Sequence, residues 1–509
     1  MEERKLTEEE RYQLEVGGYL ILPGVLTSAE LTACNQALER LGPLEGPMRW
    51  SAPAGAPLLA LRHHPVLTGY LEQICGKFHI DESPRLLGVG AEANGTALSG
   101  GGEPLDWSRA YGERQESLTR AVRVVWALAD AAEGDGGLVV VPASHTSTVE
   151  PPRDLVSGAD DMGLVRQPAL RAGDLMIHAA SLLTGLRPWR GQGPQRLLSC
   201  GYVSTSMRPS AESEIRGEED GDEEWRASLT PEQRALVHNP NRPYPPPVVM
   251  SDGERAWLEE EGGVHHPSIY TRDESSGIDE KEFYHWDLCG HLVLKGVMDA
   301  EWLAAANEAV DAHANPNPGK GGSAAGHSKR LAGTGGHRSS LGNPWKLPAP
   351  HGEPFQRMIA DPALVQRLNW IMGSGYEAML CTSFLFGKGS SGHLLHAGGG
   401  PPRVSAHYRQ QNGRVYAEFL NVAWQLRDVT AADGGFVCIP GSHKTRYRAP
   451  DCVLTCDDEL GLVRHVEAKA GDVVLFLASA QTHGAYPWTG EQDRRAIFFQ
   501  YRSRSFYAP

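Results

Sequence analysis

An internal repeat constrains the fold of this chain more than any other feature of its sequence. Residues 18–24 and residues 290–296 are both short apolar runs bounded by glycines, and they lie 272 positions apart. Short apolar runs between breaking residues predict strands. Further along, residues 172–174 and residues 470–472 both read Ala-Gly-Asp, with an offset of 298. We therefore expect two related domains in tandem.

The repeat also sets the expected domain boundaries. The first domain is expected over residues 1–206 and the second over residues 278–509. Residues 207–277 contain an acidic run and a proline-rich run, which are typical of a linker. The offset grows by 26, from 272 to 298, which places the extra residues in the Gly-, Ser- and His-rich segment 315–343. A loop of that length is typical of a lid or a disordered linker.

Short β-rich segments separated by turn residues indicate the fold class. Such segments occur at 121–128 and 137–141 in the first half, and at 419–426 and 435–439 in the second. A helix-start pattern precedes the first strand of each half. We therefore expect mainly β domains, each a sandwich or barrel with flanking helices, and we expect the two domains to pack together.

Composition narrows the range of partners. The formal net charge is -15 and the pI is about 5.7, which argues against nucleic acid or an anionic membrane as the main partner. A small-molecule substrate fits better. The N-terminus has no signal-peptide core, and no apolar run approaches the ~20 residues of a membrane span. Eight scattered cysteines fit free thiols in a reducing compartment, so we expect a cytoplasmic protein.

Three residues in the second half suggest a metal site. His483 follows a strand-like run and precedes Arg494 by eleven residues, and His396 lies at an expected strand end before a glycine-rich loop. Neutral imidazoles suit Fe(II), and an arginine can hold a carboxylate through two hydrogen bonds. The pattern therefore favours a metal together with the acid that chelates it.

The second half resembles the phytanoyl-CoA dioxygenase family. The residues that carry the resemblance are 287–297, 421–429, 433–443, 470–476 and 478–495. The resemblance implies a double-stranded β-helix (jelly-roll or cupin-like) fold in each half. It also implies Fe(II), with 2-oxoglutarate and dioxygen as cosubstrates, and hydroxylation of an unactivated C–H bond of a small molecule.

The resemblance also implies roles for individual residues. His396 and His483 would bind iron, and Arg494 would hold the distal carboxylate of 2-oxoglutarate. Arg495 and Asn421 are further expected contacts of the cosubstrate. His407, Tyr408 and Trp424 are candidates for the substrate pocket. Core packing explains Trp424 equally well, and His407 is also a possible ligand.

Two departures from the family pattern leave the chemistry open. The family carries His-x-Asp, whereas this chain has His396-Ala-Gly398, and Ala485 stands where relatives often have a hydroxyl. A carboxylate from elsewhere, water or halide in the vacant position, or a weak or absent iron site would each explain the glycine. The alternatives to a dioxygenase are therefore a halogenase-like enzyme that uses chloride and a non-catalytic binding or scaffold protein.

The first half lacks the equivalent residues. The repeat places Leu98 opposite His396, a one-residue gap opposite His483, and Gln195 opposite Arg494. We therefore expect a degenerate first domain without iron. His145 and His443 occur in both halves, so we assign these two histidines to folding.

Overall fold

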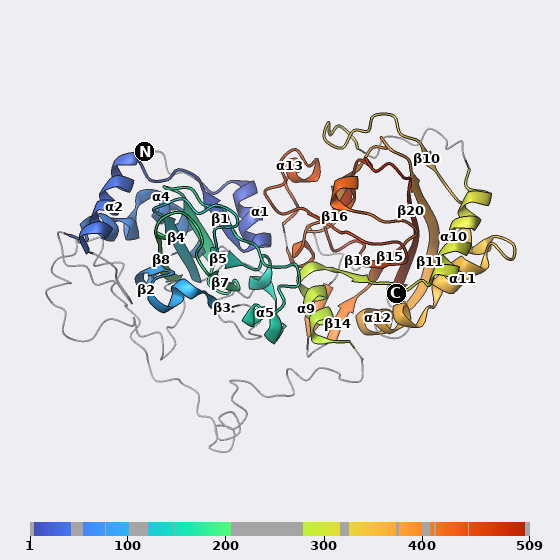
Figure 1. Ribbon diagram of the computed structural model, residues 1–509, viewed down its shortest axis with the longest axis horizontal. Coiled ribbons are helices and arrows are strands. Elements are labelled where there is room, and N and C mark those ends of the chain that lie inside the picture. Colours follow the sequence, from blue (N-terminus) through green and yellow to red (C-terminus); the bar gives the residue numbers. More distant parts are fainter. Residues whose placement is uncertain are drawn as a thin grey trace, which may run out of the picture. The chain divides into compact units, whose positions relative to one another are not determined.

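The computed structural model describes residues 5–41, 54–76, 78–100, 121–147, 149–204, 278–315, 325–372, 376–399, 408–411, 414–445 and 447–503. The chain divides into two compact units, residues 1–264 and 265–509. The expected linker, residues 207–277, lies outside the described residues. Each unit combines antiparallel sheets with flanking helices (Figure 1). In the part of the chain that is described, no helix is both long and apolar enough to cross a membrane.

The first unit contains one large and one small sheet. Its α-helices are α1 (Glu8–Gly17), α2 (Ser28–Leu41), α3 (Ala56–Ala60), α4 (Pro65–Cys75) and α5 (Arg153–Ser157). The large sheet has the order β1 (Tyr19–Leu22), β6 (Leu175–Ala179), β4 (Ala121–Ala127), β8 (Leu197–Ser204) and β2 (Phe78–Leu87). The small sheet has the order β3 (Thr96–Ser99), β7 (Thr184–Arg187) and β5 (Gly137–Val140).

The second unit has the same arrangement with added strands. Its α-helices are α9 (Glu280–Cys289), α10 (Ala300–His313), α11 (Glu353–Ile359), α12 (Pro362–Met372) and α13 (Asp451–Leu454). The large sheet has the order β10 (Arg338–Ser339), β11 (Tyr376–Phe386), β20 (Arg494–Ser503), β15 (Phe419–Gln425), β18 (Val473–Leu477) and β9 (His291–Leu294). The small sheet has the order β12 (His393–His396), β19 (His483–Tyr486), β16 (Gly435–Cys438) and β17 (Arg464–His465), and β13 (Tyr408–Gln411) pairs with β14 (Arg414–Ala417).

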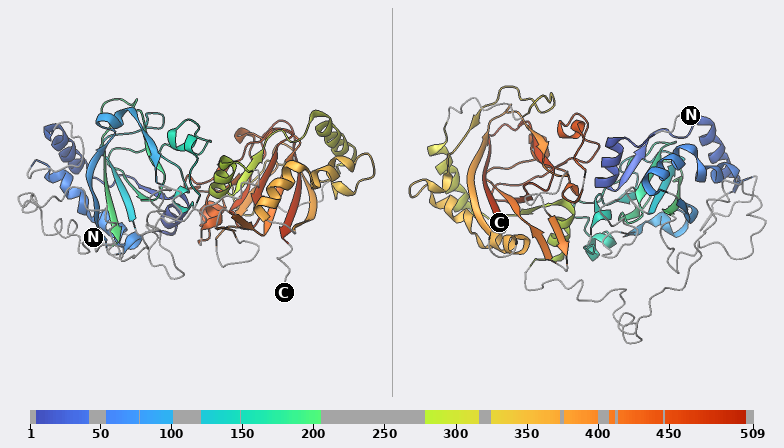
Figure 2. Two further views of the ribbon diagram at one scale, coloured as in Figure 1. Left: turned by 90° about the horizontal axis from the view of Figure 1, so that it is seen from below. Right: turned by 180° about the vertical axis from the view of Figure 1, so that it is seen from behind.

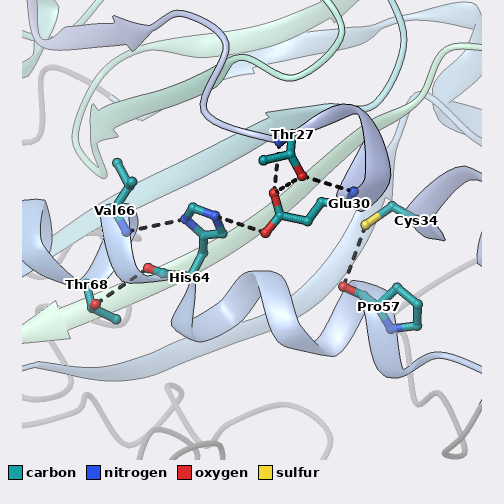
Figure 3. Close-up of polar contacts among 7 residues, drawn as sticks. All are labelled: Thr27, Glu30, Cys34, Pro57, His64, Val66 and Thr68. Atoms are coloured by element: carbon teal, nitrogen blue, oxygen red, sulfur yellow. Dashed lines mark hydrogen bonds and ion pairs between the residues drawn. The ribbon is translucent and has the colours of Figure 1, made fainter. Parts of the chain in front are cut away.

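Helices cover one face of each large sheet, and the strands of these sheets run side by side in both views of Figure 2. Local side-chain chemistry starts the covering helices. In the first unit the Thr27 hydroxyl accepts from the Glu30 backbone N–H, and the Glu30 carboxylate accepts from Thr27 (Figure 3). The same carboxylate lies 3.5 Å from His64, whose other ring nitrogen caps the start of α4 at Val66. Asp299 caps α10 of the second unit in a related way.

The same tertiary contact joins a helix to an arginine at the start of the last strand, or directly before it, in each unit. In the first unit the Arg196 guanidinium donates to Asn35 and Glu39 of α2. In the second unit, the Arg495 guanidinium donates to Asn307 at 3.1 Å and to Asp311 at 2.6 Å, both in α10. The helix residues are offset by 272, the offset of the first repeated motif.

The two turn histidines make equivalent contacts, as a folding role requires. His145 Nε2 lies 3.0 Å from the Glu15 carbonyl oxygen near the end of α1, and His443 Nε2 lies 2.9 Å from the Asp287 carbonyl oxygen in α9. Both rings are buried. His145 therefore holds α1 to the turn after β5, and His443 holds α9 to the turn after β16.

Buried neutral histidines predict a loss of stability in acid. Burial lowers the pKa of His443 to about 3 and that of His178 to about 4. Both folded values lie below the ordinary value of 6.5. The unfolded chain therefore takes up protons first, and stability falls as the pH drops below about 6.5. We expect each residue to contribute a loss of about 2 kcal/mol between pH 6.5 and 5 in urea unfolding of metal-free protein. A His443→Asn variant should show a shallower decline, and equal stability at the two pH values would contradict the prediction.

The interiors of the two units differ. All eight residues of β8 are buried, including those that face the small sheet. In β20 the helix-facing Ile497 and Phe499 are buried, whereas the inward-facing Phe498 and Gln500 keep partial exposure. The inner face of β20 is therefore more exposed than that of its counterpart β8.

Residues 325–343 of the insertion that was expected as a lid or a loose linker are packed against the second unit, so this part is not a loose linker. The Thr334 N–H donates to Gly389 O at 2.8 Å, and the Gly392 N–H donates to Leu331 O at 2.8 Å. Strand β10 then adds an edge to the large sheet by pairing with β11. The insertion is thus packed along the segment that leads into β12, because its backbone groups find partners there.

Candidate functional site

The two predicted histidine ligands lie side by side. Strands β12 and β19 pair antiparallel with His396 opposite His483, and the ring centroids are 4.3 Å apart. A bulge lies between His393 and His396 in β12. The pairing of two distant segments in the small sheet therefore creates a pair of imidazoles.

Both rings are arranged to offer a free Nε2 lone pair. His483 Nδ1 lies 2.8 Å from the Gln481 carbonyl oxygen, and His396 Nδ1 lies 3.1 Å from the Leu394 carbonyl oxygen. Because a carbonyl only accepts, Nδ1 carries the proton in each ring. Burial lowers the pKa of His483 to about 3 and also lowers the pKa of His396. Both rings are therefore neutral near pH 7, as metal binding requires.

The position of the family's carboxylate has no space for a side chain. Gly398 has a φ of +67°, and a Cβ built on it would lie 2.1 Å from Thr482 Oγ1. The preceding Ala397 also has a left-handed φ of 63°. Within the described ranges, no group of three or more His, Cys, Asp or Glu side chains is arranged to hold a metal ion. Among the described residues, no carboxylate therefore joins the paired rings of His396 and His483.

The packing at Gly398 leads to a stability prediction. We expect Gly398→Ala to lower the free energy of unfolding by about 2–4 kcal/mol, through left-handed strain plus the clash with Thr482. Gly398→Asp should be at least as destabilising and should not strengthen metal binding. Gly296 is a matched control, because its φ is +61° and a Cβ there would meet nothing within 4 Å. Gly296→Ala should cost about 1 kcal/mol, and equal costs at both sites in urea unfolding would contradict the clash.

Sequence reasoning missed His393. Its ring lies 4.7 Å from that of His396, and its Nδ1 lies 2.7 Å from the Leu394 carbonyl oxygen. The signal was present as two histidines three positions apart. In a regular strand such residues point to opposite faces, and only the bulge brings the rings together.

Arg494 lies further along the same interior. It is 4% exposed, and its Nε has no hydrogen-bond partner among the described residues. Burial lowers its pKa to about 10, so it remains charged near neutral pH. Its Cζ lies 3.7 Å from where a Cβ on Gly435 would stand. Gly435 is three residues from Cys438, the strand partner of His483, which is about 10 Å along an extended strand.

Phenylalanines connect the histidine pair to Arg494. The Phe476 ring lies 4.9 Å from His483 and 6.2 Å from Phe498. The series continues through Phe384 and Phe386, and the Arg494 Cζ lies 6.0 Å from the Phe386 centroid. The interior between the imidazoles and the guanidinium is therefore largely apolar on this side.

Two of the expected site residues face away from this interior. Arg495 is bound to Asn307 and Asp311, so the expectation that it contacts a cosubstrate is wrong. Trp424 packs against Trp302 of α10 with ring centroids 5.2 Å apart, so it lies under the helices and does not line a pocket. Side chains alternate between the two faces of a strand. Arg495 and Trp424 therefore face the helices because each is adjacent in sequence to a residue that faces the interior.

The other expected residues fall into three groups. Asn421 lies on the inner face, opposite Phe476, and its buried Oδ1 has no partner in the described part of the chain. Tyr408 donates to Asp287 at 2.9 Å and packs edge-on against His443, so the structure does not bring it to the histidine pair. His407 lies outside the described residues.

The first unit has hydroxyl side chains where the second has the imidazoles. Ser99 pairs with Thr184, and Thr184 pairs with Val140, as His483 pairs with Cys438. The sequence repeat placed Leu98 opposite His396 and a gap opposite His483. The sheet register places Ser99 and Thr184 at these positions, so each of the two expectations is wrong by one residue. The extra residue of the second unit lies in the turn that follows β18, because a turn takes up a length change that a paired strand cannot.

Gln195 lies where the repeat places it, at the position of Arg494. A Cβ on Gly137 would lie 2.2 Å from Gln195 Nε2, just as Gly435 faces Arg494. Serine and threonine hydroxyls with a neutral amide are poor ligands for Fe(II) and for a carboxylate. The first unit therefore has a different set of side chains at the equivalent position.

The second unit is thus a two-sheet β domain in which the exposed ring of His396 lies beside the buried ring of His483. The buried guanidinium of Arg494 lies by Gly435, about 10 Å along β16 from the strand partner of His483. This arrangement suits a metal ion and an anionic chelator. Residues 286–496 match the family model of phytanoyl-CoA dioxygenase (PhyH). No curated protein shows a significant sequence match to the chain.

Solved structures are similar to parts of the chain at low identity. HygX from Streptomyces hygroscopicus, with nickel, 2-oxoglutarate and hygromycin B bound, is 18% identical over 45% of this chain and 88% of its own, with a TM-score of 0.37. AviO1 from Streptomyces viridochromogenes Tue57 is 18% identical over 44% of this chain and 94% of its own, with a TM-score of 0.32. The non-heme alpha ketoglutarate dependent epimerase SnoN from nogalamycin biosynthesis is 20% identical over 44% and 82%, with a TM-score of 0.30.

Proposed function

We propose that this protein is an Fe(II)- and 2-oxoglutarate-dependent dioxygenase that hydroxylates an unactivated C–H bond of a small molecule. The observation that carries the proposal is the His396 and His483 pair together with the buried Arg494, whose Nε has no hydrogen-bond partner among the described residues. The guanidinium lies by Gly435, about 10 Å along β16 from the strand partner of His483, and such a spacing suits a five-carbon dicarboxylate that chelates a metal at one end. The family match over residues 286–496 supports the same function.

The residues present fit these groups. Nε2 of His396 and of His483 would hold Fe(II), and Arg494 would pair with the distal carboxylate, which supplies the partner that its Nε lacks. The unpartnered Asn421 Oδ1 would accept a hydrogen bond from a bound water or the substrate. When bound, iron with 2-oxoglutarate and dioxygen supplies the oxidising chemistry, with succinate and carbon dioxide as coproducts.

The protein's own contribution is binding, orientation and exclusion of water. The Gln481 and Leu394 carbonyls fix the tautomer and the ring plane of the two histidines. Phe476, Phe498 and Phe384 border the space between the metal and the carboxylate positions, so charges in this space are weakly screened.

We extend the proposal to the whole chain as two tandem double-stranded β-helix domains, residues 1–206 and 278–509, joined by a linker at 207–277. The first is a degenerate copy that does not bind iron. The equivalent strand orders, the equivalent contacts of Arg196 and Arg495, and Ser99 and Thr184 in the ligand positions support this reading.

An anaerobic titration tests the proposal. Fe(II) added with 2-oxoglutarate should give the weak visible charge-transfer band of the chelate. The band should be lost in His483→Ala and retained in Thr184→Ala, the matched change in the first unit. A scaffold protein would show no band in any variant, and that result would remove the dioxygenase assignment.

A halogenase-like reaction is a second candidate, and Gly398 favours it. Since there is no room for a carboxylate at that position, a metal held by His396 and His483 would leave a coordination position for chloride. Mass spectrometry of products formed with and without chloride distinguishes the two reactions. Chlorinated product would favour the second candidate, and hydroxylated product under both conditions would favour the first.

A further inference from the structure

A buried glutamine on the inner face of the large sheet has a side-chain oxygen without a hydrogen-bond partner among the described residues. Gln425 ends β15 and is 3% exposed, and its Oε1 has no hydrogen-bond partner in the described part of the chain. An unpaired buried amide is costly, so such groups commonly bind water or a ligand. The Gln425 backbone, by contrast, is fully paired with Asp472 and Gly471.

Gln425 and Arg494 are neighbours on the same face of the large sheet. Gln425 pairs with Ala496 of β20, and Arg494 lies two residues before Ala496 on that strand. Such diagonal neighbours have Cα atoms about 7–8 Å apart, and their side chains point the same way. A buried acceptor and a buried donor therefore project from the same sheet face without a hydrogen bond between them, and one bound group could contact both.

We propose that Gln425 and Arg494 together form the binding site for the distal carboxylate of the cosubstrate, and that Gln425 helps to select dicarboxylic over monocarboxylic 2-oxo acids. This inference rests on the proposed function. The amide N–H donates to one carboxylate oxygen while the guanidinium donates to the carboxylate. A flip of the amide end brings the NH₂ group to the position that Oε1 has in the structure.

The first unit has lost both members of this site. Ala127 pairs with Leu197 as Gln425 pairs with Ala496, and Gln195 occupies the position of Arg494. Ala127 is fully buried and carries no polar side chain. The amide and the guanidinium thus occur together in the unit that has the imidazole pair.

Equilibrium binding to Mn(II)-loaded protein tests the inference without turnover. The variant is Gln425→Met, which keeps the side-chain length and removes the hydrogen bonds. We expect 2-oxoglutarate to bind about 10- to 100-fold more weakly in calorimetry. Binding of 2-oxopentanoate, which has the same carbon chain and no distal carboxylate, should be unchanged. Gln195→Met, which changes a buried glutamine of the first unit, should leave both affinities unchanged.

The outcomes separate this inference from the proposed function. If Gln425→Met binds 2-oxoglutarate as tightly as the parent while Arg494→Met binds it weakly, the glutamine has no role and the dioxygenase proposal stands. If Gln425→Met weakens both 2-oxo acids equally, the residue acts through packing and the inference fails. If the parent protein binds no 2-oxoglutarate, the proposed function itself is wrong.

Discussion

Replacement of Arg494 by methionine is expected to weaken 2-oxoglutarate binding by about 100-fold or more. The Nε of the buried guanidinium has no hydrogen-bond partner in the described residues, so a carboxylate bound there would form charge-assisted hydrogen bonds in a poorly screened interior. Loss of about 3 kcal/mol from such a pair corresponds to roughly two powers of ten in affinity. Calorimetry or the dependence of activity on 2-oxoglutarate concentration measures the change.

The adjacent arginine is the matched control. Arg495 lies on the same strand, but its guanidinium binds Asn307 and Asp311 of α10. We expect Arg495→Met to lower stability slightly, because Asp311 is largely exposed, and to leave 2-oxoglutarate affinity close to that of the parent. Equal losses of affinity in the two variants would remove the assignment of Arg494 to the carboxylate.

Replacement of Lys444 by methionine is expected to lower the free energy of unfolding by about 3–5 kcal/mol. Lys444 Nζ lies 2.7 Å from Asp287 Oδ2, and the two side chains are 12% and 1% exposed. Burial by itself raises the pKa of Asp287, but Lys444, His443 and the Tyr408 hydroxyl outweigh that effect and the net pKa is lowered. Without the lysine, a carboxylate is left buried with too few partners. Urea unfolding at pH 7 measures the loss.

The double variant Asp287→Asn, Lys444→Met provides the control, because it removes both charges together. We expect it to be more stable than Lys444→Met alone. The sign of the pH dependence also follows from the lowered pKa. The contribution of the ion pair is present above the unfolded pKa of about 4 and is lost as the pH falls through the lower folded value. A single variant within 1 kcal/mol of the parent would show that the pair is not a main support of α9.

The candidate site shows how far sequence reasoning reaches. The spacing of His483 and Arg494 predicted two of its members, and pairing with β12 placed His396 beside His483. Identification of His393 and Gln425 depended on a bulge and on unpaired buried atoms, which no local pattern reports. Arg495 and Trp424 were assigned to the site because motif positions do not state which face of a strand a side chain occupies.

In the first unit, sequence comparison placed the counterparts of the site residues only to within one residue. The repeat placed Gln195 at the position of Arg494, yet it misplaced the counterparts of both histidines, because a gap can be moved along a sequence without changing the match. Strand pairing is sensitive to a single residue, since a shift by one turns every side chain to the other sheet face. Ser99 and Thr184 could therefore be identified only from the sheet register.

The sequence by itself determined the mainly β class, the repeated apolar and glycine pattern, and the residue types available for a metal and a carboxylate, because these depend on local propensity and composition. Tertiary structure decided which histidines meet, which of two adjacent arginines faces the interior, and that Gly398 leaves no space for a carboxylate. Those outcomes depend on long-range strand pairing, of β12 with β19 in the small sheet and of β20 with β15 in the large sheet. Neither local sequence nor motif spacing specifies the register of that pairing.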